Sequence, residues 1–251
     1  MSRRSRRVVV VALAVAGMVV PVLLAAAQYP TWWVWIAPEQ VPMTWFQSVT
    51  LVVAGVMSLL AWYVAGIIGR GPRLGHSLLA VGFLALALDE RFALHERVRD
   101  GILAPRDVRL PGLTWVAPGD FILILVALAG LLVLPLVVRS LGRDRWVRGL
   151  FVLGIGLSVV SVGTDSIDPS TWSVQAERVQ QSLEECVELW AGLSYLAAVT
   201  LRLLGLVDRL AQRSAAEPVV AVGGPRDGAA HEPVDAPIGS PAREVDPEPV
   251  S

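Results

Sequence analysis

Long apolar runs separated by short polar stretches make up most of the chain before residue 214. A helix needs about 20 apolar residues to cross a hydrocarbon core of roughly 30 Å, and runs near that length recur along this part of the chain. The pattern therefore predicts an all-α polytopic membrane helix bundle. The six expected transmembrane helices cover residues 8–27, 45–69, 75–98, 120–142, 146–168 and 179–208.

The apolar pattern stops near residue 213, where the sequence changes to "SAAEPVVAVGGPRDGAAHEPVDAPIGSPAREVDPEPVS". This segment is rich in Pro, Ala and Gly and shows no amphipathic period, which is typical of disorder. We therefore expect a transmembrane helix bundle over residues 1–213 and a disordered cytoplasmic tail over residues 214–251. His231 lies in this tail and is not expected to bind a ligand.

Arginine counts in the short loops predict the orientation, because cytoplasmic loops are enriched in basic residues. The segments "RRSRR", "GRGPR" and "RSLGRDRWVR" then lie inside, whereas the first outer loop, "QYPTWWVWIAPEQVPMT", has no basic residue. The expected topology is N-in and C-in, with multi-pass insertion in the plasma membrane. Loop 99–119 is discordant, since it is expected outside but contains Arg. A cleaved signal peptide is the alternative for the first run, although that run exceeds the 7–15 apolar residues typical of such peptides.

Composition supports this class and excludes others. The chain has 251 residues, of which 54% are hydrophobic and 17% charged, and its mean hydropathy is +0.59. The net charge of −1 gives no basic surface for nucleic acid, so the expected partner is the lipid bilayer. All 21 basic residues are Arg. The single Cys186 excludes an intramolecular disulfide and a Cys-rich metal site.

Small and acidic residues share one face in three of the expected helices, because residues spaced by three or four positions align along a helix. Small residues on such a face allow close helix packing, so we expect the acids to point into the bundle. The three stripes are Gly82, Ala85, Asp89, Ala93 and Glu96 in the third helix, Gly154, Ser158, Ser161, Asp165 and Asp168 in the fifth, and Gln181, Glu185, Glu188, Gly192 and Tyr195 in the sixth.

At a rise of 1.5 Å per residue, the acidic ends of these stripes reach the same depth, in the outer third of the membrane. Thr44, Gln47 and Ser48 begin the second helix at this level. The pattern therefore predicts an outward-facing polar pocket. Its candidate members are His95 and the eight acids Asp89, Glu90, Glu96, Asp165, Asp168, Glu184, Glu185 and Glu188.

So many carboxylates in a low dielectric need cations, protons or Arg to offset their charge. A divalent metal is the first possibility, since carboxylates with one imidazole form a hard, oxygen-rich site. Metal-activated water would then support hydrolysis, with a spare carboxylate such as Glu184 as the general base. Glu184 and Glu185 are the candidate catalytic residues. The expected metal ligands are Asp89, His95, Glu96, Asp165, Glu185 and Glu188.

Two alternatives remain open at this point. Intramembrane acids that carry protons are typical of transporters, and Arg91, Arg97 and Arg178 could instead form a structural ion network with the acids. The structural interpretation is simplest for Glu90, which is rotated about 100° from Asp89, and it also suits Asp168 and Glu184. His95 lies off the Asp89 face, so a surface or capping role competes with metal ligation.

Tryptophans are concentrated on the expected outer side of the membrane. They predict an interfacial aromatic belt or, alternatively, a lid over the pocket formed by "TWWVWIAPEQVPMTW" or a place that receives a lipid tail.

Familiar catalytic motifs are missing, including Walker, HExxH, GxSxG and CxxC elements.

The elements "DERFALHE" (89–96) and "EECVE" (184–188) resemble the DExxxxHE and EExxE elements of a group of uncharacterised bacterial multi-pass membrane proteins. The resemblance covers two helices and the general layout. It implies that Asp89, Glu90, His95, Glu96, Glu184, Glu185 and Glu188 belong to one site, and it implies no reaction.

The sequence thus predicts a membrane protein with an outward-facing cluster of carboxylates and His. The leading expectation is a metal site, with a divalent metal ion as cofactor, that supports hydrolysis of a lipid or envelope substrate. A small proton-coupled transporter of a small molecule and a non-catalytic protein with an Arg and acid ion network are the alternatives.

Overall fold

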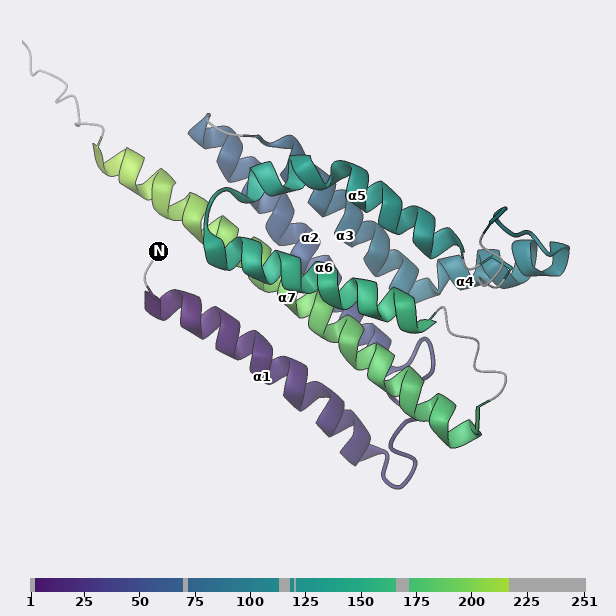
Figure 1. Cartoon of the computed structure of the whole chain (residues 1–251). Coiled ribbons are helices and arrows are strands. Elements are labelled where there is room, and N and C mark those ends of the chain that lie inside the picture. Colours follow the sequence, from purple (N-terminus) through teal and green to yellow (C-terminus); the bar gives the residue numbers. More distant parts are fainter. Residues whose placement is uncertain (1–2, 70–71, 113–117, 120, 166–171, 217–251) are drawn as a thin grey trace, which may run out of the picture. The chain divides into compact units, whose positions relative to one another are not determined.

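The computed structural model describes residues 3–69, 72–112, 118–119, 121–165 and 172–216, and the secondary structure of this part is entirely helical (Figure 1). The expected all-α class is therefore confirmed. The short helix α4 (Leu94–Val98) leads into a π-helical turn, η1 (Arg99–Leu103), and a 3-10 turn, η2 (Ala104–Arg106). The long helices are α1 (Arg3–Ala27), α2 (Pro42–Ile68), α3 (Leu74–Phe92), α5 (Phe121–Leu141), α6 (Arg145–Asp165) and α7 (Val174–Ala216).

Within the described residues, five helices are long and apolar enough to cross a membrane: α1, α2, α5, α6 and α7. Helix α3 has 19 residues and ends with three consecutive charged residues before Phe92. Its crossing of the membrane and the N-in, C-in topology stay predictions. Helix α7 extends to Ala216, and the rest of the expected tail, residues 217–251, lies outside the described residues.

Local sequence accounts for both ends of α2. Pro42 is the first helical residue, a position where its missing N–H removes no helical hydrogen bond. Gly69 ends the helix in the left-handed region, at φ 70°, and its N–H donates to the Gly66 carbonyl oxygen at 3.1 Å. Helix α2 is thereby fixed between the first loop and the turn to α3.

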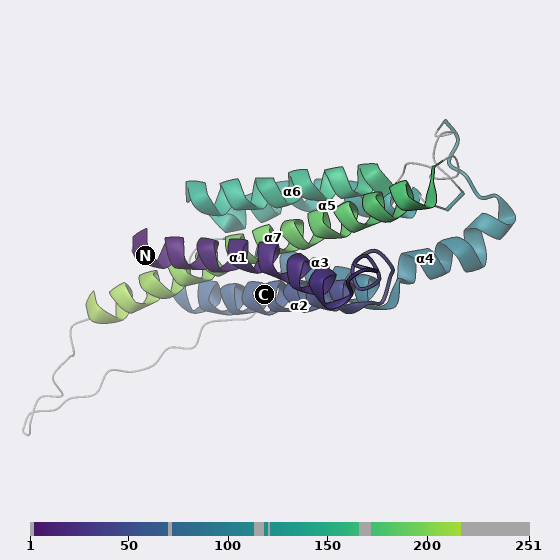
Figure 2. The same ribbon diagram turned by 90° about the horizontal axis from the view of Figure 1, so that it is seen from below.

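Helix α7 packs against α1, α2 and α6, while α3 packs against α2 and α5 (Figures 1 and 2). Gly154 lets α6 approach α7 closely, since a Cβ at this position would lie 2.6 Å from a ring carbon of Tyr195 in α7. Ser158, one turn further, hydrogen-bonds the Tyr195 hydroxyl at 3.1 Å. The expected contact between the stripes of these two helices is therefore confirmed.

Candidate functional site

A short polar face at the start of α2 is buried inside the helical bundle. Thr44 and Ser48 donate to backbone carbonyl oxygens of their own helix, at Val41 and Thr44 respectively. Gln47 instead reaches the neighbouring helix, where its Nε2 donates to the Glu185 carbonyl oxygen at 2.9 Å. This hydrogen bond ties α2 to α7 beside the acidic residues of α7.

Three carboxylates from two helices converge next to this contact. Carboxylate oxygens of Glu90 in α3 and of Glu185 and Glu188 in α7 all lie within 4.8 Å of one another. Glu185 and Glu188 are three residues apart and so share one face of α7. We call these three residues the carboxylate cluster. Three oxygens at this separation are suited to hold one metal ion between them.

Hydrogen bonds satisfy only part of the cluster. Ser161 of α6 donates to Glu188 Oε1 at 2.6 Å, which connects a third helix to the site. Glu185 is 5% exposed, and its Oε2 has no hydrogen-bond partner within the described residues. The Oε1 atom of Gln47, which is 3% exposed, likewise has none there. Buried polar atoms in native proteins are nearly always paired, so these two oxygens call for a donor or a cation.

Like charges also surround the cluster. Glu39, in the loop before α2, interacts electrostatically with Glu90 and with Glu185, and Asp89 and Glu96 act on Glu90 in the same way. Repulsion among close carboxylates is strong away from water. The site therefore favours a positively charged occupant.

The end of α3 brings a second polar pair to the same region. Ala93 adopts the left-handed conformation, at φ 47° and ψ 50°, which separates α3 from α4. His95 contacts Asp89 across this break: its backbone N–H donates to Asp89 Oδ1 at 2.8 Å, and its Nδ1 lies 2.8 Å from Asp89 Oδ2. A carboxylate held in this way fixes the orientation of the imidazole.

The other candidate residues occupy different surroundings. Glu96 lies 3.2 Å from an Arg99 guanidinium nitrogen, and Glu184 accepts a hydrogen bond from Gln180 Nε2 at 2.9 Å. Asp165 is the last residue of α6, and its side chain lies outside the described residues. Asp168 also lies outside them. Of the six expected metal ligands, the structure thus brings together Glu185 and Glu188, and it pairs Asp89 with His95.

Glu90 and Gln47 join this site although neither is among the expected ligands. The buried face of α3 runs through His76, Leu79, Ala80, Phe83 and Ala87, which leads to Glu90 by a step of three. Gly82 and Ala85 of the expected stripe are exposed instead. Residue size does not mark this face, because the small Ala80 and Ala87 are buried whereas the large Val81, Leu86 and Leu88 are exposed.

The arginines near the site contact groups outside the cluster. Arg178 places its guanidinium 4.1 Å from the centre of the Trp33 ring, which connects the first loop to α7. Arg99 donates to Asp100 Oδ1 at 2.8 Å, and this hydrogen bond lowers the pKa of the exposed Asp100 carboxyl. Arg91 lines an open cavity at the ends of α2 and α3. The arginine that pairs with acids here is Arg99, which is not one of the three arginines expected in an ion network.

These observations define an all-helical protein with several helices that could cross a membrane and with a partly buried carboxylate cluster between two of its helices. The chain belongs to a family described as a domain of unknown function (DUF8692), which matches residues 5–203 and so includes the whole cluster. This agrees with the expected membership of an uncharacterised family, while a bacterial source and the two shared motifs stay predictions. No curated protein and no solved structure matches the chain.

Proposed function

We propose that this protein is a polytopic membrane protein that binds a divalent cation at Glu90, Glu185 and Glu188. One observation carries the proposal: a buried, unpartnered carboxylate oxygen of Glu185 lies beside two further carboxylates, with oxygens of all three within 4.8 Å. A bound cation would supply the missing partner and offset the mutual repulsion.

The donor set favours a hard cation. Three carboxylates provide oxygen ligands only, and Gln47 Oε1 lies in the same buried region as a fourth oxygen donor. Mg²⁺, Mn²⁺ and Ca²⁺ prefer such ligands, whereas structural Zn²⁺ sites use mainly Cys and His. We therefore expect Mn²⁺, Mg²⁺ or Ca²⁺ rather than a thiophilic metal.

Hydrolysis of a lipid or envelope substrate is the activity that we propose for this site. A cation held by Glu90, Glu185 and Glu188 would make water more acidic. Support for a base comes from the His95 and Asp89 pair, because a carboxylate-oriented imidazole is suited to accept a proton. Asp89 is also the residue directly before Glu90, so the pair adjoins the cluster along the chain. In this proposal His95 acts as the base, and Glu184, which bonds Gln180, is less suited to that role.

We further propose that α3 crosses the plasma membrane together with the five apolar helices, with both termini inside. The cluster then lies near the outer surface, because α3 would travel outward and carries Glu90 close to its end. The basic N-terminal segment and the Arg-free first loop support this orientation.

Elemental analysis of the detergent-purified full chain tests the cation proposal. Wild type purified without chelator should contain close to one divalent metal per chain, and Glu185→Gln should lose it while eluting as the same folded species. Glu177→Gln, which changes an acid in the first turn of the same helix, should keep the metal. Metal-free wild type that also fails to bind added Mn²⁺, Mg²⁺ or Ca²⁺ would refute the proposal, and pH-dependent flux in vesicles would then favour the transporter.

A further inference from the structure

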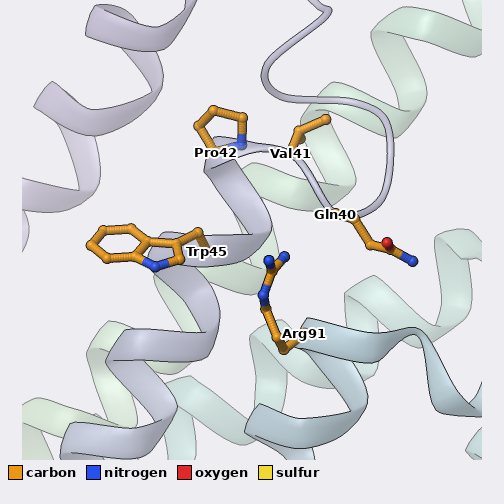
Figure 3. Close-up of a pocket in the computed structure, with 5 residues that line it drawn as sticks. All are labelled: Gln40, Val41, Pro42, Trp45 and Arg91. Atoms are coloured by element: carbon orange, nitrogen blue, oxygen red, sulfur yellow. The ribbon is translucent and has the colours of Figure 1, made fainter.

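A second polar feature lies next to the carboxylate cluster and is separate from it. Residues of the first loop, the start of α2 and the end of α3 surround an open cavity of about 480 Å³ (Figure 3). Its lining residues are Gln40, Val41, Pro42, Trp45 and Arg91. Figure 3 shows the Arg91 guanidinium rising from α3 between the Trp45 ring on one side and Gln40 on the other. We call this feature the Arg91 pocket.

Arg91 supplies the positive charge of this pocket. Its side chain is exposed and makes no hydrogen bond or ion pair with any residue in the described part of the chain. An Arg guanidinium binds phosphate oxygens through two parallel hydrogen bonds, and such charge-assisted bonds are stronger than neutral ones. The free guanidinium and the Gln40 amide therefore suit the phosphate group of a ligand.

The surface below the pocket is apolar, which indicates what else the ligand carries. Trp45 is 50% exposed, and the exposed residues Val49, Val52 and Val56 follow it along α2 at steps of four, three and four. Steps of three and four keep residues on one face of a helix, so these side chains form a continuous apolar stripe that starts at the pocket. Leu88, one turn before Arg91 on α3, is exposed as well.

A phosphate site above an exposed apolar stripe matches a membrane phospholipid, whose acyl chains would lie against the stripe while its headgroup occupies the pocket. Trp45 at the junction supports this placement, because Trp is enriched where membranes meet water. We propose that the Arg91 pocket binds the phosphate group of a phospholipid, with its acyl chains along Val49, Val52 and Val56. Binding itself is independent of the cation, whereas the assignment of this lipid as substrate rests on the proposed function.

Two residues of the Arg91 pocket directly follow residues of the carboxylate cluster or its surroundings in the sequence. Gln40 follows Glu39, which interacts electrostatically with Glu90 and Glu185, and Arg91 follows Glu90 itself. The pocket and the carboxylate cluster are therefore neighbours along the chain at two places. This arrangement names the substrate class of the proposed hydrolase as a phosphate-bearing lipid.

Native mass spectrometry of the full chain in detergent tests the pocket with dioleoylphosphatidylglycerol as the probe, in the presence of EDTA and again with Mn²⁺. Wild type should bind one lipid molecule saturably in both conditions, and Arg91→Gln should weaken that binding by about ten- to one-hundredfold, the loss expected for a charge-assisted bond. Arg97→Gln, which neutralises an exposed Arg of α4, is the matched control and should bind as wild type does. Arg91→Gln should still bind the cation, whereas Glu185→Gln should lose the cation and keep the lipid in EDTA.

Three results would overturn the assignment. Binding of the phospholipid to Arg91→Gln as tightly as to wild type would show that the guanidinium has no part in binding. Equal affinity for dioleoylglycerol would show that only the apolar stripe binds, and equal affinity for glycerol 3-phosphate would show that the pocket takes a soluble phosphate. Lipid binding that depends on Arg91 in a protein without cation affinity would uphold the pocket and refute the proposed function alone.

Discussion

Replacing Glu185 by Gln tests the carboxylate cluster most directly, because the change removes one charge and keeps the size of the side chain. The three carboxylate oxygens lie within 4.8 Å of one another. Two like charges at that limiting distance repel each other by about 3.5 kcal/mol at an effective dielectric constant of roughly 20. A shared proton would relieve part of this repulsion. In the presence of chelator, we therefore expect the variant to exceed wild type in free energy of unfolding by about 1 to 3 kcal/mol.

Added cation should offset most or all of this difference. A ligand present at one hundred times its Kd stabilises the folded state by about 2.7 kcal/mol, provided that it does not bind the unfolded chain. Wild type should gain this stability with Mn²⁺, and Glu185→Gln should gain little of it. The assay is thermal unfolding in detergent, followed by the fluorescence of the nine Trp residues, with EDTA and then with increasing Mn²⁺.

Glu177→Gln serves as the control, because it removes an acid from the same helix outside the cluster. It should leave Tm close to that of wild type under both conditions. Two results together would refute cation binding by the cluster: a lower Tm for Glu185→Gln than for wild type in EDTA, and a wild-type Tm that does not change with Mn²⁺, Mg²⁺ or Ca²⁺. The Glu185 carboxylate would then stabilise the fold by itself.

Two further predictions concern packing and topology. Gly154→Ala should lower the free energy of unfolding by about 1 to 3 kcal/mol, the usual range for overpacking, because the added Cβ would meet the Tyr195 ring at 2.6 Å. Gly156→Ala is the control, since no atom lies within 4 Å of its new Cβ. It should cause no loss of stability in the same thermal assay. In a Cys186→Ala background, a membrane-impermeant maleimide applied to intact cells should label Thr31→Cys and not Ser214→Cys, and the opposite labelling would refute the N-in, C-in topology.

The contact between α6 and α7 could be predicted from sequence because both helices carry a recognisable packing pattern. Gly154 and Ser158 recur on one face of α6 at a step of four, and Tyr195 lies on the matching face of α7. A small residue opposite a large one is the pattern of close helix packing. The structure adds only which atoms meet, namely the Ser158 and Tyr195 hydroxyls.

The end of α3 could not be predicted in the same way. Ala93 is an alanine, which favours the right-handed helix, yet it adopts the left-handed conformation and is buried. For a residue other than Gly, this conformation costs about 1 to 2 kcal/mol, so the surrounding packing must maintain it. The periodic pattern continues a straight helix through this position and thereby separates His95 from Asp89, although the structure joins them.

Helix α3 also shows why an apolar helix ends in "DER". Successive residues of a helix point about 100° apart, so each of the three charged side chains meets a different environment. Asp89 holds the His95 imidazole, Glu90 completes the carboxylate cluster with α7, and Arg91 lines the cavity beside Trp45. A shift of α3 by one residue would exchange these environments and place a positive charge where the cluster needs a carboxylate. The packed face of α3, from Leu79 to Ala87, therefore sets the register on which both proposed sites depend.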